Sequence, residues 1–303
     1  MHSTYAQAAK AFAARGAAAA DPLTMPIEQA RQQQDSYFVE FNCDLPALAE
    51  VKNVLISGPH GDLPLRLHYP VKTSAVLPVI VFVRGAGWWA GSLDSHARTM
   101  HNLALLSSCV VCGVDYRRTP DHHFPVQRDE LLTAIDWLQT EGVGHGLQIA
   151  PPVLFGESAG ATLCLSAAMA LRDRGRPAPA GLVLFYTNAG GPKPTARAYS
   201  QWVWTQYLGH EGASTDGSAV PLLGDLSGLP PMWLGAGEDD PLMADTLTLE
   251  RLVRASGQTP ELVTYPGLPH GFVMWTGLLA PALQALEQAS VAARKFFGSR
   301  LVA

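Results

Sequence analysis

The chain has 303 residues, of which 48% are hydrophobic and 16% charged, and its 21 Lys and Arg against 26 Asp and Glu give a formal charge of −5. So few charges exclude a disordered or polyelectrolyte chain, and without a basic stripe no nucleic-acid partner is expected. No apolar run reaches the ~18 residues of a membrane span, so we expect no membrane insertion.

The first 45 residues indicate helices rather than a targeting segment. Residues 6–20 are rich in alanine, but Lys10 and Arg15 interrupt the run, and alanine is a weak filler for the apolar region of a signal peptide. An amphipathic helix is the better interpretation. Four cysteines are too few for a disulfide scaffold, so a reducing, cytoplasmic location is expected.

From about residue 50, short β-branched runs alternate with longer helical stretches, which is typical of an α/β sheet. Residues 51–57 and 63–69 predict a hairpin turned at residues 58–61. The central strands are apolar throughout rather than alternating, so they are expected to be parallel and covered on both faces. Further strands are expected at 79–83, 109–114, 153–155, 182–185, 232–236 and 261–265, and helices at 95–106, 125–139, 159–172, 243–255 and 281–297.

Two stretches do not follow this alternation. Residues 1–45 read as helical, and residues 188–226 are rich in Gly, Pro and aromatic side chains. Additions to an α/β sheet often cover its active edge. We therefore expect both to be cap segments on a catalytic core formed by residues 46–187 and 227–303.

Cys109 and Cys112 have the spacing of a zinc-binding pair, but no second pair follows them. They lie in an apolar run that predicts a buried strand, in which residues three apart point to opposite faces. Buried thiols are the better interpretation. No metal ion and no cofactor are expected.

The sequence Gly156-Glu-Ser-Ala-Gly160 lies between a predicted strand and a predicted helix, the context of a nucleophile elbow. A serine on such a tight turn leaves little room for neighbouring side chains, which explains the glycines two residues away on each side. The turn presents Ser158 and aims the N–H of Ala159 at a developing oxyanion. The alternative is a helix-capping serine with packing glycines.

A base and an acid follow in the order found in α/β-hydrolases. Asp240 comes after the strand predicted at 232–236, and His270 after the last predicted strand. Both therefore lie on loops beyond the carboxyl ends of their strands. Asp239 is the reserve candidate for the acid.

A glycine-rich loop, Arg84-Gly-Ala-Gly-Trp88, follows the strand at 79–83 and can aim backbone N–H groups at a charge. Here the chain resembles the bacterial hormone-sensitive-lipase-like (family IV) carboxylesterases, which carry His-Gly-Gly-Gly-Trp at this point and Gly-Asp-Ser-Ala-Gly at the elbow. Their Asp-Tyr-Arg-Leu-Ala-Pro-Glu-His-Pro-Phe-Pro is similar to residues 115–125. Their Asp-Pro-Leu and His-Gly-Phe match residues 240–242 and 270–272.

The resemblance implies an α/β-hydrolase fold, with a mostly parallel eight-stranded sheet flanked by helices and a helical cap. It also implies a serine hydrolase that cleaves small carboxylic esters of short to medium acyl chain through an acyl-enzyme, and a homodimer. Carried over by position, Ser158 is the nucleophile, His270 the base and Asp240 the orienting acid. The oxyanion hole is formed by the N–H groups of Ala86, Gly87 and Ala159.

Two positions depart from the family pattern. Arg84 stands in place of histidine and Ala86 in place of glycine. If the turn needs a positive φ at residue 86, alanine there costs roughly 1–2 kcal/mol relative to glycine. We expect Arg84 to anchor the loop through a carboxylate such as Asp115 or Glu157; a surface arginine is the alternative.

Aromatic residues near these motifs are expected to line the substrate pocket and to favour small or flat groups over long lipid chains. Core packing beneath a cap is the alternative for all of them. The candidates are Trp88, Trp89, Trp202, Trp204 and Tyr207.

Three other functions remain open at this point. Gly85-x-Gly87-x-x-Ala90 after a strand matches a dinucleotide fingerprint, which would indicate an NAD(P)-dependent oxidoreductase, although two tryptophans occupy positions that the pyrophosphate approaches. A non-catalytic ligand receptor on the same fold is expected to lose a triad member. An amidase or formamidase would use the same triad.

Overall fold

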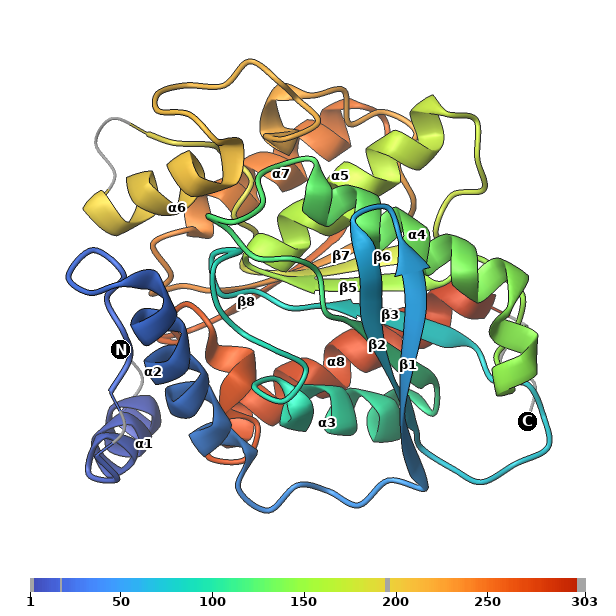
Figure 1. The fold of residues 1–303 in the computed structure, drawn as a ribbon, viewed down its shortest axis with the longest axis horizontal. Coiled ribbons are helices and arrows are strands. Elements are labelled where there is room, and N and C mark those ends of the chain that lie inside the picture. Colours follow the sequence, from blue (N-terminus) through green and yellow to red (C-terminus); the bar gives the residue numbers. More distant parts are fainter. Residues whose placement is uncertain (1–2, 17, 194–196, 299–303) are drawn as a thin grey trace.

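The computed structural model describes residues 3–16, 18–193 and 197–298 (Figure 1). The strands are β1 (Glu50–Gly58), β2 (Gly61–Tyr69), β3 (Val79–Val83), β4 (Val110–Val114), β5 (Val153–Glu157), β6 (Gly181–Phe185), β7 (Met232–Gly237) and β8 (Glu261–Tyr265). The α-helices are α1 (Ser3–Ala13), α2 (Ile27–Val39), α3 (Ala97–Ser107), α4 (Val126–Thr140), α5 (Ala159–Asp173), α6 (Ala198–Leu208), α7 (Met243–Ala255) and α8 (Ala280–Phe297). Short 3₁₀ turns are η1 (Glu40–Asn42), η2 (Gly142–His145), η3 (Pro221–Leu223) and η4 (Phe272–Trp275).

In the described part of the chain, these strands form one sheet in the order β1-β2-β4-β3-β5-β6-β7-β8. The pairs β1–β2 and β2–β4 are antiparallel, and every other neighbouring pair is parallel. The predicted eight-stranded, mostly parallel sheet of the α/β-hydrolase fold is thus confirmed. The carboxyl ends of the parallel strands meet at one edge, so the loops that follow them are brought together.

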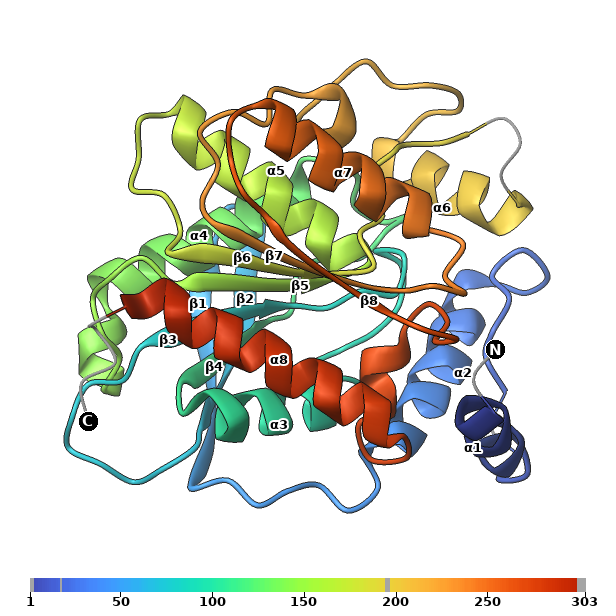
Figure 2. The same cartoon turned by 180° about the vertical axis from the view of Figure 1, so that it is seen from behind.

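Helices cover both faces of the sheet, with α3 and α8 on one face and α4, α5 and α7 on the other (Figures 1 and 2). Strand β3 shows why an uninterrupted apolar run fits here. Val79, Val81 and Val83 pack into one hydrophobic cluster, while Ile80 and Phe82 pack into the second cluster on the opposite face. Because successive side chains point to opposite faces, both sets are buried only if both faces are covered.

Most predicted elements lie where expected. The hairpin and the helix predicted at 243–255 are found as β1–β2 and α7. Helix α6, within residues 188–226, was not predicted. It buries Val203, Trp204 and Tyr207, and its aromatic residues gave no clear one-sided apolar pattern.

The N-terminal helices pack beside η4, at the end of the sheet where the parallel strands finish (Figure 2). Their contact is aromatic. Phe12 stacks on Phe41 with ring centroids 4.2 Å apart, and Phe41 meets the ring of Trp275 edge-on at 4.9 Å. Such pairs add to the hydrophobic stabilisation of the contact, which joins residues far apart in the sequence.

Cys109 and Cys112 are both free and buried, and they lie on opposite faces as predicted. Burial raises the pKa of the Cys112 thiol to about 12, so this thiol is protonated at neutral pH. Among the described helices, none is both long enough and apolar enough to cross a bilayer.

Candidate active site

Strand β5 turns into α5 at Ser158, whose backbone has φ 51° and ψ −119°. A positive φ is strained for a residue with a side chain and is held only where the surroundings enforce it. The flanking glycines show how. A Cβ at Gly156 would lie 2.7 Å from the backbone of Ala161, and one at Gly160 only 2.0 Å from the carbonyl oxygen of Val83. The turn therefore requires glycine at both positions.

The structure brings together the three side chains predicted as a triad. His270 Nε2 lies 2.9 Å from Ser158 Oγ, and His270 Nδ1 lies 2.9 Å from Asp240 Oδ2. Asp240 follows β7, is buried and also accepts a hydrogen bond from the N–H of Leu242 at 2.7 Å. Asp239, the reserve acid, is exposed, so the geometry favours Asp240.

The loop after β3 lines the same cavity as Ser158 and His270. Ala86 and Gly87 have φ values of 69° and 60°. Within the described residues, their N–H groups and that of Ala159 donate no hydrogen bond to the backbone, whereas the N–H of Ser158 donates to Phe185. The three groups predicted as an oxyanion hole therefore have N–H donors to offer, and Ala86 does adopt the conformation that is costly for alanine.

Arg84 is buried and anchors this loop to the segment after β4. Its guanidinium donates to the carbonyl oxygen of Tyr116 at 3.0 Å and lies over the Tyr116 ring at 3.9 Å from the centroid. The carboxylate of Asp115 is 3.5 Å away, and the Tyr116 hydroxyl donates back to the Arg84 carbonyl. Of the two expected carboxylates, Asp115 is the partner and Glu157 is not. The surface-arginine alternative was wrong.

A buried polar cluster that no local sequence pattern predicts lies next to the triad. The Tyr186 hydroxyl donates to the Glu157 carboxylate, His96 Nε2 lies 3.0 Å from the same carboxylate, and Ser95 Oγ is 2.8 Å from His96 Nδ1. The Tyr186 ring meets the His270 ring edge-on at 4.8 Å. Burial raises the pKa of Glu157, but attraction to His96 and hydrogen bonds from His96 and Tyr186 outweigh it, so the pKa lies below its usual value.

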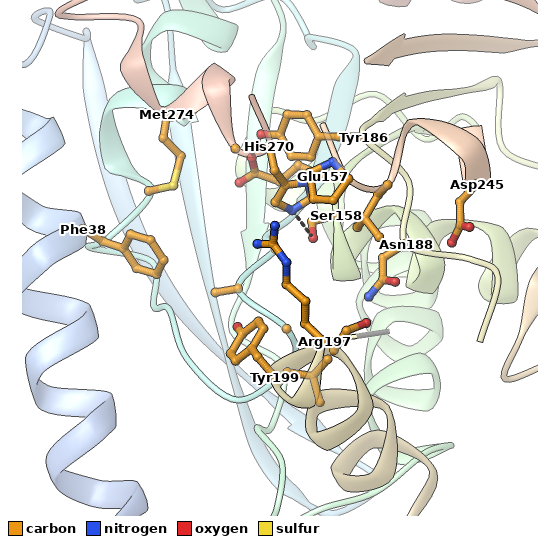
Figure 3. Close-up of a pocket in the computed structure, with 18 of the residues that line it drawn as sticks. Phe38, Glu157, Ser158, Tyr186, Asn188, Arg197, Tyr199, Asp245, His270 and Met274 are labelled. Carbon is orange, nitrogen blue, oxygen red and sulfur yellow. Dashed lines mark hydrogen bonds between the residues drawn. The ribbon is translucent and has the colours of Figure 1, made fainter. Parts of the chain in front are cut away.

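Ser158 and His270 open onto a cavity of about 560 Å³. In Figure 3, Phe38 and Met274 lie on one side of the two residues, and Asn188 and Asp245 on the other. The first side, which we call the aromatic side, is lined by Tyr5, Tyr37, Phe38, Phe41, Met274 and Trp275. The second, which we call the polar side, is lined by Asn188, Lys193 and Asp245, and the Arg197 side chain lies between the two sides, near Ser158 and His270.

Of the five aromatic residues predicted to line a pocket, only Trp204 is among the described residues that line this cavity. Trp88 turns into the core because its φ is 64°, and its Nε1 donates to the Ala159 carbonyl while its ring stacks on Tyr207 at 4.0 Å. Trp89 instead donates to the Tyr199 hydroxyl and meets Trp202 edge-on. Trp88, Trp89 and Tyr207 thus pack against Trp204 or Tyr199, which line the cavity, and Trp202 packs against Trp89.

The fold and the Ser-His-Asp arrangement at the carboxyl edge of the sheet define a serine hydrolase of the α/β-hydrolase fold. The glycine loop that resembled a dinucleotide fingerprint belongs to this arrangement, since a Cβ at Gly85 would lie 3.2 Å from the Ser158 Cβ. The oxidoreductase and receptor alternatives are not favoured.

Comparisons with known proteins agree with this class. The α/β-hydrolase fold family model matches residues 80–274, and the chain belongs to this family, among the carboxylesterases that resemble hormone-sensitive lipase. Carboxylesterase NlhH of Mycobacterium tuberculosis is 30% identical over 77% of this chain and 78% of its own length. The acetyl esterase of Salmonella typhi is 26% identical over 89% of this chain and 87% of its own.

Solved structures show the same fold. An α/β-hydrolase enzyme from the metagenome of Lake Arreo, Spain, is 26% identical with a TM-score of 0.88, over 99% of both chains. An esterase from Pyrobaculum calidifontis is 26% identical with a TM-score of 0.83, over 89% of this chain and 93% of that one.

Proposed function

We propose that this carboxylesterase hydrolyses small carboxylic esters of short to medium acyl chain through an acyl-enzyme. The observation that carries the proposal is the unbroken hydrogen-bonded line from Ser158 Oγ through His270 to Asp240. Relatives described as a carboxylesterase and an acetyl esterase support the ester as substrate.

In the proposed reaction, His270 accepts the proton of Ser158 as its hydroxyl attacks the ester carbonyl. Asp240 holds the imidazole tautomer and stabilises the imidazolium. The N–H groups of Ala86, Gly87 and Ala159 bind the oxyanion, His270 protonates the leaving alcohol, and water then repeats the sequence on the acyl-enzyme. The strained turn at Ser158 and the flanking glycines keep the nucleophile in place without rearrangement.

Residues 1–45 and 188–226 form the cap in this proposal. Support comes from their share of the cavity wall: Tyr5 and Phe38 come from the first segment, and Arg197 and Trp204 from the second. The core of residues 46–187 and 227–303 then supplies the reacting groups. A cavity of about 560 Å³ is in the range that suits a small ester.

We also propose a cytoplasmic location and a homodimer. The four cysteines, all free in the structure, support a reducing compartment. The dimer rests on family resemblance and is tested by sedimentation velocity of the purified protein.

A fluorophosphonate probe tests the proposed nucleophile. Mass spectrometry should find the label on Ser158, and Ser158→Ala should lower kcat by about 10⁶-fold because the triad acts as a unit. Hydrolysis of p-nitrophenyl butyrate should exceed that of the palmitate. A label elsewhere, or an active Ser158→Ala variant, would reject the mechanism, and faster palmitate hydrolysis would reject the acyl-chain preference.

A further inference from the structure

Helix α6 lies directly on the loop that carries the proposed oxyanion hole. A Cβ at Gly87 would lie 3.0 Å from Val203 Cγ1 and 3.2 Å from the Tyr199 hydroxyl. Arg197, the residue immediately before α6, lines the same cavity as Ser158. Figure 3 shows its side chain extended into this cavity toward Ser158 and His270.

The charged groups around Arg197 are already matched to one another. Lys193 pairs with Asp245, whose carboxylate also accepts the N–H groups of Ala189 and Gly190. The carboxylate of Glu157 faces His96 and Tyr186, and that of Asp240 faces His270.

Arg197 is largely exposed to solvent and has no such partner among the residues that the structure describes. Among the described residues, no carboxylate lies within ion-pair distance of its guanidinium. Its place at the start of α6 adds to the imbalance, because the N-terminal end of a helix is itself positive and favours an anion. Among the described residues that line the cavity, Arg197 thus carries a positive charge that no carboxylate pairs with.

We infer that the site takes esters that also carry a carboxylate, which Arg197 binds while Ser158 attacks the ester carbonyl. The planar guanidinium binds a carboxylate through two parallel hydrogen bonds, which fixes orientation as well as charge. The apolar remainder of such a substrate fits the aromatic side of the cavity. This inference rests on the proposed ester hydrolysis and narrows its substrate class to monoesters of dicarboxylic acids or esters of carboxylate-bearing alcohols.

Two pairs of substrates test it, each pair matched in size and differing in charge. Monoethyl adipate and ethyl adipamate place the carboxylate or its neutral amide on the acyl part. 4-Acetoxybenzoate and 4-acetoxybenzamide place it on the leaving alcohol. In at least one pair, kcat/KM should be about tenfold higher for the carboxylate, and the advantage should shrink as salt is added.

Arg197→Gln should remove this advantage, lowering the carboxylate-to-amide ratio of kcat/KM about tenfold, mainly through KM. Arg197→Lys should retain part of the advantage of the carboxylate substrate, because the positive charge remains but the two parallel hydrogen bonds of the guanidinium are lost. Arg174→Gln makes the same charge change at an exposed position that does not line the cavity, and it should leave the ratio as in the wild type.

Equal kcat/KM for both members of both pairs, or an equal fall for both in Arg197→Gln, would overturn the inference. Failure of the proposed function looks different, since then neither the charged nor the neutral esters would be hydrolysed.

Discussion

Two regions form the cavity in different ways. Ser158, Asp240 and His270 come from loops that leave β5, β7 and β8, so the backbone of one sheet fixes their separation. The aromatic side comes from α1, α2, η1 and η4, whose mutual positions depend on ring packing between segments far apart in the chain. The positions of the reacting groups are therefore fixed by one sheet, whereas the aromatic side of the cavity depends on packing between helical segments that are far apart in the sequence.

The largest expected effect lies in the sheet loops. Asp240→Asn should lower kcat by about 10⁴-fold, because the amide favours the wrong imidazole tautomer. Asp239→Asn is the matched control on the neighbouring exposed carboxylate and should stay within a few fold of the wild type. Steady-state kinetics with p-nitrophenyl butyrate measure both, and an inactive Asp239→Asn beside an active Asp240→Asn would reverse the assignment.

The second effect separates core from cavity wall. Trp88→Ala should lower the free energy of unfolding by about 3–5 kcal/mol, because the whole indole is buried against Tyr207 and the Ala159 carbonyl. Phe38→Ala, on the aromatic side, should instead raise KM for esters with aryl acyl groups at a smaller cost in stability. Urea unfolding measures the stability of both variants, and steady-state kinetics measure their KM values. If Trp88→Ala changed KM without loss of stability, Trp88 would belong to the wall.

The third effect concerns the stability of the sheet, through a buried histidine of β2. Burial, then the nearby charges of His101 and Arg66, lower the pKa of His68 to about 3. Protonation therefore favours the unfolded chain, in which the pKa is about 6.5, and stability is lost as the pH falls from 6.5 toward 3. Between pH 7 and 4.5 this loss is about 2.5 kcal/mol.

In His68→Leu, the free energy of unfolding measured in urea should fall by about 2.5 kcal/mol less between pH 7 and pH 4.5 than it does in the wild type. Activity measured in parallel separates acid unfolding of the sheet from titration at the active site. An unchanged pH dependence in His68→Leu would contradict the expectation.

The smallest effect tests the strained loop. Ala86→Gly should raise the free energy of unfolding by about 0.5–1 kcal/mol, because relief of the positive φ slightly exceeds the added freedom of the unfolded chain. Thermal and urea unfolding measure it. A less stable Ala86→Gly variant would show that packing of the Ala86 methyl group stabilises the fold by more than its positive φ destabilises it.

The sequence predicted the sheet and triad because each signal was local. Gly156 and Gly160 mark the elbow whatever surrounds it, and Asp240 and His270 directly follow strands. The interpretation of Trp88 also rested on a local signal, its position next to the oxyanion loop in the sequence. That position does not determine where the side chain points, and Trp88, with a positive φ, packs into the core. The aromatic side and the contacts of Glu157 depend on pairings between distant segments, which no local pattern reveals.

The position of α1 has a practical consequence. Tyr5 of this helix lines the cavity, whereas the end of α8 lies on the opposite side of the molecule (Figures 1 and 2). A fusion partner attached ahead of α1 would stand beside the aromatic side. Immobilising the enzyme on a resin through a tag placed after α8 leaves that side facing the solution.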